Sequence, residues 1–219
     1  ALPTDDDLAR TVRRGAPGTS MPSWGRILGE SAIRDVVAYV KTFSPRFRSA
    51  HPAPLALPDA VPVLDEAASR RGRNVYVLMR CFTCHGLTGE GDGPAAATLR
   101  DDRGRPILPY DFTDGRFHSG GRPIDVYRTF STGVNGTPMP SFDEALLIGR
   151  EAFGDLSELT TVVEGRRVED LRRFVATMPT SDELDSMPEQ ARVERSARLR
   201  WDLVAYVRSL ASGGTFRAF

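Results

Sequence analysis

The sequence is poor in the residues that build cross-links and metal clusters. Its 219 residues include only two cysteines and three histidines, too few for a disulfide scaffold or for a zinc site with two cysteine pairs. An excess of one charge is also lacking, because 29 basic residues balance 29 acidic ones, which argues against a general nucleic-acid binder. Apolar runs such as residues 36–40 are far shorter than the roughly 20 residues that cross a bilayer. What is present, 40% hydrophobic residues, is enough for a packed core.

Both cysteines lie in one motif, Cys81-Phe-Thr-Cys84-His85, which is the attachment sequence of a c-type heme. Two thiols about one helical turn apart add to the two vinyl groups of one porphyrin, and the next residue, His85, then reaches the iron. A thioredoxin-like pair would need a preceding strand, whereas residues 65–80 predict a helix. A structural zinc site would need a fourth ligand, for which only the other two histidines remain. The motif therefore predicts covalently bound heme c.

With this motif, the sequence resembles the class I cytochrome c family over residues 64–211, with a partial second copy at 1–48. The predicted helix before the motif carries Gly72 and Tyr76, four residues apart on one face. Residues 199–210 predict a last helix. Its apolar stripe consists of Leu199, Leu203, Tyr206, Val207 and Leu210. The resemblance implies an all-α cytochrome c fold, in which a small residue lets the first and last helices cross closely.

The second axial ligand of the iron has several candidates, namely the methionines, two histidines and water. Met139 lies among glycines and prolines, and its flanking prolines stiffen the backbone, although filling a gap in the core is the usual role of methionine. Its surroundings resemble the Gly-Thr-x-Met-Pro ligand loop of cytochromes c, so Met139 is the expected ligand. Ligation of the iron by methionine and histidine raises the reduction potential of the heme. His118 is the rival, and His51 lies in a Pro-rich stretch typical of solvated residues. Two further methionines precede a proline without the Gly-Thr context: Met178 and Met187.

The resemblance also suggests groups that surround the heme. A ligating histidine usually donates its second ring N–H to a carbonyl, and in cytochromes c a proline soon after the heme motif offers that carbonyl. Pro94 matches by position, although an ordinary turn-rich loop would have the same residue types. Three residues are candidate partners of the heme propionates: Tyr110, Arg122 and Trp201.

An internal repeat connects the N-terminal part of the chain with the Met139 region. With an offset of 118 residues, identical residues pair as follows: Arg10 with Arg128, Gly15 with Gly133, Gly18 with Gly136, Thr19 with Thr137, Met21 with Met139, Pro22 with Pro140, and Ser23 with Ser141. Further on, residues 35–41 match residues 202–208 with an offset of 167. The second copy thus contains 49 additional residues between its methionine loop and its last helix.

Residues 1–48 therefore look like the back half of a cytochrome c domain, with Met21 as the candidate axial ligand of a second heme. They contain no Cys-x-x-Cys-His motif. Three explanations compete: a first heme motif lies upstream of a truncated chain, this domain has lost its heme, or Met21 serves a heme held by another chain. The first is favoured, because a half domain alone would expose the apolar face of its helix. The chain begins Ala-Leu-Pro without a leader, so we expect that a leader was removed or that the start is incomplete.

The remaining segments are a linker, an insertion and a tail. Residues 49–63 carry prolines at four positions and predict a semi-extended linker. The insertion at about 143–195 holds 13 acidic residues and 7 arginines. Its periodicity predicts a helix at 168–178 and a second one starting near Ser181 or Pro188. A solvated helical cap is the ordinary interpretation, and a docking surface for redox partners is the sharper one. Residues 212–219 form a tail.

Electron transfer is the function that these features favour, with the chain as a mobile carrier or as a cytochrome subunit of a larger redox complex. An iron held by His85 and Met139 leaves no position for a substrate, so the chain is not expected to be an enzyme. A heme enzyme acting on peroxide or a small oxyanion through an open heme position is the alternative. A heme-based sensor would need a signalling domain, which the sequence does not show. The resemblance implies a periplasmic or otherwise extracytoplasmic location.

Overall fold

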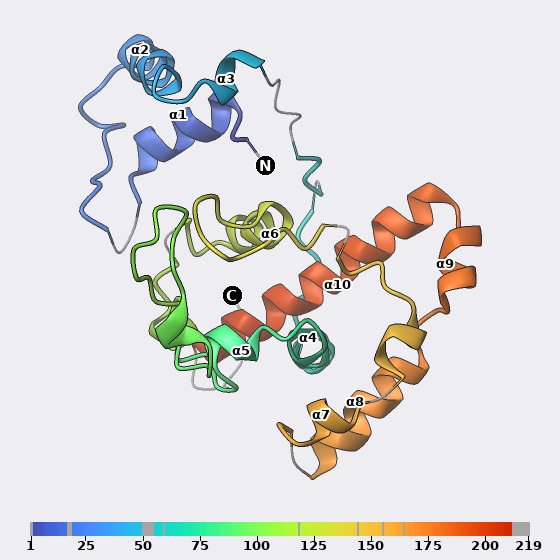
Figure 1. The fold of residues 1–219 in the computed structure, drawn as a ribbon. Helices are drawn as coiled ribbons and strands as arrows, with labels where there is room; N and C mark the ends of the chain where they lie inside the picture. The colour runs from blue at the N-terminus through green and yellow to red at the C-terminus, as the bar shows by residue number, and fades with distance from the viewer. Residues whose placement is uncertain are drawn as a thin grey trace.

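The structure is a computed structural model that describes residues 2–16, 19–49, 55–58, 60–117, 119–143, 145–154, 156–163 and 165–211. Within these ranges the chain is helical and has no strand, only one isolated bridge between Arg100 and Pro106 (Figure 1). The expected all-α fold is confirmed. No helix within these ranges has the length and apolar character needed to cross a membrane.

Two helices that cross at the centre of the molecule organise the C-terminal part (Figure 1). Helix α4 (Glu66–Leu78) begins at Asp65, whose carboxylate accepts the Ala68 N–H. Helix α10 (Glu189–Leu210) is buried on all sides over residues 199–207. The crossing requires Gly72, because a Cβ at this position would lie 1.8 Å from the carbonyl oxygen of Asp202. The small residue expected at this crossing is therefore present for a steric reason.

Three short elements and one longer helix surround this pair. They are α5 (Phe82–His85), η1 (Ala96–Thr98), η2 (Phe112–Asp114) and α6 (Pro123–Thr132). Helix α6 has proline in its first turn, where the missing N–H costs no helical hydrogen bond. It packs against α10, where the Tyr127 and Trp201 rings stack with centroids 4.4 Å apart.

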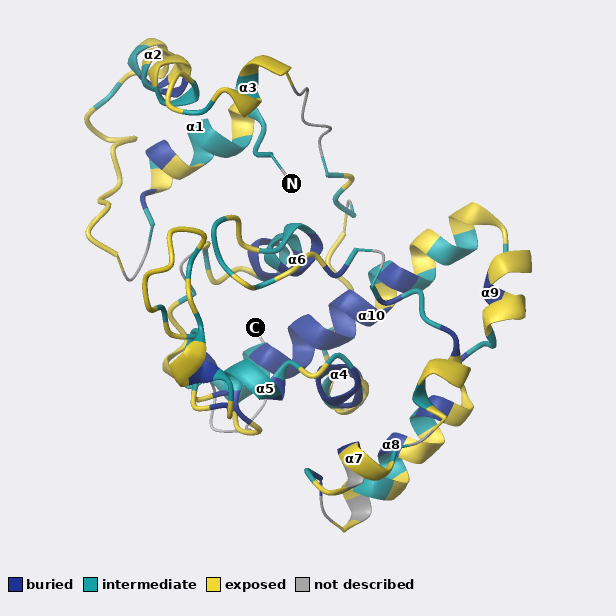
Figure 2. Cartoon of the chain, viewed as in Figure 1, coloured by how far each residue is buried: buried dark blue, intermediate teal, exposed yellow. Residues whose placement is uncertain are grey.

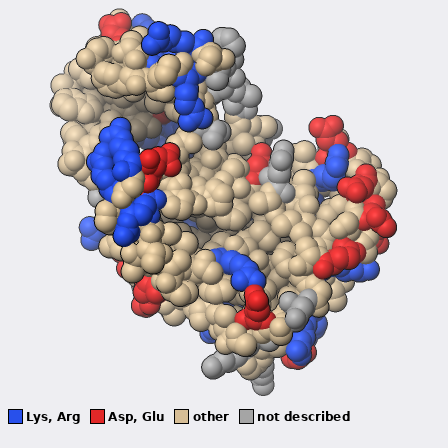
Figure 3. All heavy atoms as spheres, viewed as in Figure 1, with Lys and Arg blue, Asp and Glu red and all other residues tan. Residues whose placement is uncertain are grey.

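The insertion forms a helical arm beside α4. Its elements are η3 (Arg150–Phe153), α7 (Ser157–Thr160), α8 (Arg166–Ala176) and α9 (Ser181–Ser186). Helices are thus present near both predicted positions, but the last helix already begins at Glu189, inside the stretch expected to be insertion. Ion pairs fasten the arm: Arg73 to Asp170 at 3.2 Å and Arg80 to Glu158 at 2.7 Å. Acidic side chains gather over α9 and the start of α10 (Figure 3).

The N-terminal region contains α1 (Asp5–Arg14), α2 (Glu30–Lys41) and α3 (Arg46–Ser49). A capping box between Thr4 and Asp7 begins α1. Helix α2 buries Ile33 and Val37 and packs against α1. The two helices are also joined by an ion pair of 2.6 Å between Lys41 and Asp5.

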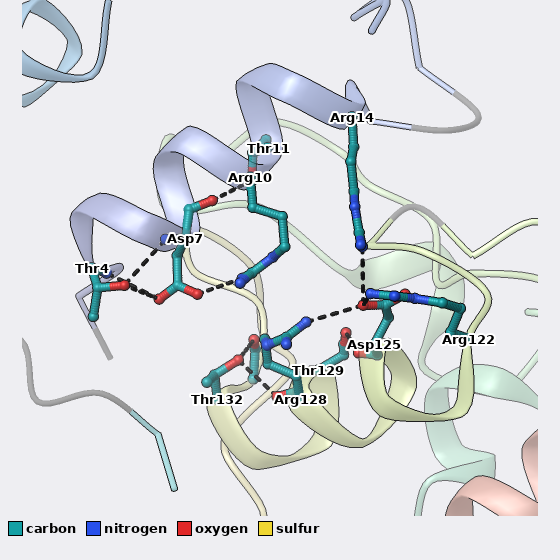
Figure 4. A network of polar contacts seen from close by, with 11 residues as sticks. Thr4, Asp7, Arg10, Thr11, Arg14, Arg122, Asp125, Arg128, Thr129 and Thr132 are labelled. Atoms are coloured by element: carbon teal, nitrogen blue, oxygen red, sulfur yellow. Dashed lines mark hydrogen bonds and ion pairs between the residues drawn. The ribbon is translucent and has the colours of Figure 1, made fainter. Parts of the chain in front are cut away.

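A polar network connects α1 with α6 (Figure 4). Asp125, only 2% exposed, accepts hydrogen bonds from Arg122 and Arg128 of its own region and pairs with Arg14 of α1 at 3.5 Å. Burial opposes the charge of this carboxyl, but the hydrogen bonds from Arg122 and Arg128 prevail, and its pKa lies below the ordinary value. The contact joins the N-terminal region to the C-terminal part through an ionised, hydrogen-bonded carboxylate.

Candidate heme site

A cavity of about 750 Å³ opens between the Cys-x-x-Cys-His segment and the Met139 loop. Its wall includes both cysteines, His85 and Met139, and it is otherwise mostly apolar. The structure therefore brings together the four groups that the sequence assigned to attachment of the heme and to its two axial positions.

The motif is held in one short helical turn by a sharp change of backbone direction. Arg80 is the one non-glycine residue with positive φ, 54°, among those that the structure describes. The Cys81 N–H then donates to the Tyr76 carbonyl at 3.0 Å, and the His85 N–H donates to the Cys81 carbonyl at 2.9 Å. Because of this turn, both thiols and the imidazole line the same cavity. Burial raises the pKa of the Cys81 thiol to about 12.

The orientation of the His85 ring is fixed by Tyr110 and Phe112. Its Nδ1 lies 3.0 Å from the carbonyl oxygen of Tyr110, and since a carbonyl only accepts, Nδ1 carries the proton and donates. The Phe112 ring stacks on the imidazole with centroids 4.4 Å apart. Burial lowers the pKa of His85 against the opposing effect of the Tyr110 carbonyl, which favours the neutral ring that binds metals. Nε2 is left as the nitrogen able to bind iron.

The carbonyl that accepts from this imidazole differs from the expected one, because it belongs to Tyr110 and not to Pro94. Pro94 is exposed and lies in a turn, whereas the carbonyl bonded to His85 Nδ1 is that of Tyr110. The helix of the motif is followed by a loop that turns back through Gly91 and Gly93, whose N–H groups bond His85 and Cys84 carbonyls. Pro94 does not line the cavity that His85 lines. No sequence spacing identifies the Tyr110 carbonyl, because it lies 25 residues downstream.

The Met139 loop is organised by hydrogen bonds that follow α6. The Val134 N–H donates to the Met139 carbonyl at 3.2 Å, and the Phe142 N–H donates to the Phe130 carbonyl at 2.8 Å. Ser141 Oγ donates to the Ser131 carbonyl at 2.6 Å. Met139 is partly buried and lines the cavity, as its assignment as ligand requires.

The loop around Met21 has the same hydrogen-bond pattern, shifted by 118 residues. The Ala16 N–H donates to the Met21 carbonyl at 3.1 Å, the Trp24 N–H to the Val12 carbonyl at 3.2 Å, and Ser23 Oγ to the Arg13 carbonyl at 2.7 Å. The glycine that starts each loop has positive φ, 73° at Gly15 and 66° at Gly133. A Cβ at either glycine would lie 2.6 Å from the carbonyl carbon of the proline that follows the methionine. The repeat in sequence is therefore also a repeat in structure at these loops.

Two of the expected propionate partners lie elsewhere, and the third has another role. Trp201 stacks on Tyr127 and lines a different cavity, beside the linker. Arg122 is engaged by Asp125 at 2.9 Å and is not part of the cavity wall. Tyr110 does line the cavity, but its hydroxyl donates to Asp114 at 2.6 Å. The alternative ligands His51 and His118 lie outside the described residues.

Comparison with known proteins identifies the family of this chain. The family model for cytochrome c matches residues 69–158, which include the heme motif and Met139. A solved structure from Kuenenia stuttgartiensis, a chain of the "reducing HAO-like protein complex Kustc0457/Kustc0458", is similar with a TM-score of 0.70 and 34% sequence identity. The similarity covers 96% of this chain and 73% of that chain. The present chain belongs to the c-type cytochrome family.

Membership in this family implies covalently bound heme c, and the cavity fits such a group. It offers two thiols one turn apart, a neutral imidazole with Nε2 available and a thioether on the facing loop, within apolar walls. These are the donors that hold a low-spin, six-coordinate iron in cytochromes c.

Proposed function

We propose that this chain transfers electrons through a heme attached at Cys81 and Cys84 and ligated by His85 and Met139. The observation that carries the proposal is the placement of all four groups on one cavity. Bound heme supplies an iron that alternates between the ferric and ferrous states. The protein holds the imidazole through the Tyr110 carbonyl and stacks Phe112 on it. An apolar wall and a thioether ligand both favour the ferrous state and raise the reduction potential.

We further propose that the chain works as a subunit of a larger redox complex outside the cytoplasm. The similar Kuenenia chain was solved as part of a complex, which supports this setting. Acidic side chains gather over α9 and the start of α10 (Figure 3), and a charged surface steers a redox partner of opposite charge. Because c-type heme is attached outside the cytoplasm, we place the complex in the periplasm or an equivalent compartment.

The Met21 loop supports a second proposal, that the N-terminal region supplies one axial ligand to a second heme. Three hydrogen bonds of the Met139 loop, two between backbone groups and one from a serine hydroxyl, are repeated in it. Met21 is 36% exposed, so its thioether is accessible from outside the N-terminal region. The first heme and the second are thus proposed to share one type of ligand loop.

Replacement of each methionine separates the two proposals. Met139→Ala in the heme-loaded chain should abolish the weak long-wavelength band of thioether-ligated ferric heme and lower the reduction potential, because an open position or water replaces the sulfur. Met21→Ala should leave the optical spectrum of the Cys81/Cys84 heme unchanged. Optical titration and potentiometry measure both effects.

The heme-enzyme alternative makes the opposite prediction for the unaltered protein. An open heme position would give a high-spin ferric spectrum and rapid, complete carbon monoxide binding to the reduced protein. That result, with Met139 intact, would refute the electron-transfer assignment in favour of catalysis at the iron.

A further inference from the structure

The middle of helix α10 is buried, and residues 199–207 of this stretch include one arginine, Arg200 (Figure 2). The residue is only 4% exposed. Its guanidinium lies over the Tyr127 ring, with Cζ 4.8 Å from the ring centroid. A charge in such a place is costly unless polar or charged groups compensate it. The groups that compensate this arginine therefore indicate what the residue does.

Arg200 binds both ends of the Met139 loop. Its Nη1 donates to Ser131 Oγ at 2.6 Å, in the last turn of α6 before the loop. The same Nη1 lies 2.7 Å from a carboxylate oxygen of Asp143, just after the loop. Ser196, one turn earlier on α10, donates from its hydroxyl to the Asp143 carbonyl at 2.6 Å. Arg200 and its neighbour on α10 thus fasten the loop to this helix.

The Met21 loop reaches the same shape without these groups. The offsets of the internal repeat match Arg200 with Ile33, Asp143 with Gly25 and Ser131 with Arg13. Ile33 is apolar and fully buried, and Gly25 has no side chain to accept a hydrogen bond. The Met21 loop nevertheless forms three of the hydrogen bonds of the Met139 loop. The shape of a methionine loop therefore does not require Arg200.

The two copies differ in what joins the loop to the helix that follows it. In the N-terminal copy, Arg13 pairs with Glu30 of α2 at 2.7 Å, but these side chains are 41% and 64% exposed. Water surrounds an exposed ion pair of this kind, which constrains a loop little. Arg200 makes its bonds from a buried position, where charge-assisted hydrogen bonds are stronger. The Met139 loop is therefore held against α10 more firmly than its shape requires.

We propose that Arg200 is a positioning residue for the thioether of Met139. By fixing Ser131 and Asp143, it keeps the loop beside the cavity and limits detachment of the sulfur from the iron. Arg200 is not part of the cavity wall, so it acts through the loop and not by contact with the heme. The inference rests on the proposed ligation by His85 and Met139, and it names the residue that sets how firmly the second ligand is held.

Imidazole added to the ferric, heme-loaded chain tests the proposal, because it binds the iron only where the thioether has detached. Its apparent affinity therefore rises with the fraction of detached Met139. We expect Arg200→Met to raise this affinity about ten-fold, or about 1.4 kcal/mol, close to the value of one hydrogen bond to a charged group. The reduction potential should fall. Arg200→Lys, which keeps the charge without the fork of donors, should recover part of the wild-type affinity and potential. Optical titration and potentiometry measure both.

Two further variants separate positioning from general stability. Arg71→Met is the matched control, since Arg71 of α4 also pairs with an aspartate of α10, Asp202 at 2.6 Å, but lines the cavity beside the linker. It should lower stability and leave the imidazole affinity within about two-fold of wild type. Asp143→Ala removes a carboxylate that is 48% exposed, so it tests the loop even where Arg200→Met does not fold. It should raise the affinity by a smaller factor, and adding it to Arg200→Met should have no further effect, because both break one ion pair.

Amide hydrogen exchange reports on the loop independently of the iron. The N–H groups of Val134 and Phe142 close the Met139 loop, and those of Ala16 and Trp24 occupy the matched positions of the Met21 loop. In Arg200→Met, exchange at the first two should accelerate about ten-fold through local opening. Exchange at the second two should not change, because their loop has no counterpart of Arg200.

The outcomes that overturn the inference differ from those that overturn the proposed function. Wild-type imidazole affinity in Arg200→Met and Asp143→Ala, with unchanged exchange at Val134, would refute the role of Arg200 alone. An equal rise of affinity in Arg71→Met would refute it too, because the cause would be general destabilisation. A wild-type chain that lacks the optical band of thioether ligation would refute the proposed function, and this inference with it.

Discussion

The two methionine loops fold alike, while the helices that match across the repeat are buried very differently. The loops at Met21 and Met139 share their hydrogen bonds and their positive-φ glycine. In contrast, the aromatic residue of the matched helices is 66% exposed at Tyr39 and 9% exposed at Tyr206. Loop geometry is therefore encoded locally by glycine, serine and proline, whereas burial depends on a partner helix from elsewhere in the chain.

The largest expected effect comes from disrupting the packing of α4 on α10, which buries the repeat pattern in the C-terminal part. Gly72→Leu should abolish the α4–α10 crossing, because even a Cβ would lie 1.8 Å from the Asp202 carbonyl oxygen. We expect a loss of more than about 3 kcal/mol in the free energy of unfolding, at the upper end for single substitutions. Urea unfolding followed by circular dichroism measures it. Gly29→Ala is the control, since nothing lies within 4 Å of a Cβ there, and an equal loss in both variants would contradict the steric explanation.

A matched pair of tyrosine substitutions sharpens the comparison at one repeat position. Tyr206→Ala should destabilise the 219-residue chain by about 3 kcal/mol, the cost of removing a large aromatic side chain from a core. Tyr39→Ala should change stability by less than about 0.5 kcal/mol, because the residue is largely exposed. Thermal unfolding of the two variants gives the difference. Similar losses would mean that Tyr39 is buried in this chain after all.

A smaller loss than those at Gly72 and Tyr206 concerns the contact between the two regions. Asp125→Asn should cost about 2 kcal/mol at pH 7, as expected for hydrogen bonds to a charged group. The pKa of Asp125 lies below its ordinary value of 3.8, so its contribution is fully present above about pH 4 and is lost as the pH falls through the folded-state pKa. The difference between wild type and variant should thus shrink from pH 5 to pH 2. Denaturant midpoints measured at several pH values test this, and a constant difference would exclude titration of Asp125.

The parts of the site that sequence could predict are those with fixed local spacing. The Cys81, Cys84 and His85 motif requires one helical turn, and Met139 sits in a loop whose glycine and prolines specify its shape. The all-α fold followed from the same resemblance. These predictions depend on short-range geometry, which a single sequence displays.

The parts that sequence could not predict depend on long-range packing. The carbonyl at Tyr110 reaches His85 only because the intervening loop folds back, which no spacing rule states. Trp201 was expected near the propionates but faces Tyr127, because α10 turns that side toward α6. The sequence pattern did not indicate that α10 starts at Glu189, because its first three turns carry mostly polar residues and no clear apolar stripe.

Lys41, which pairs with Asp5, is the only lysine of the sequence, and this has a practical consequence. Apart from the α-amino group, amine-reactive reagents therefore have one target, at the end of α2 and two residues from Phe43. A fluorophore or spin label on this amine would report on α2 without an engineered cysteine, which would compete with Cys81 and Cys84 for heme. The composition of the chain thus supplies a single attachment point for a reporter group on α2.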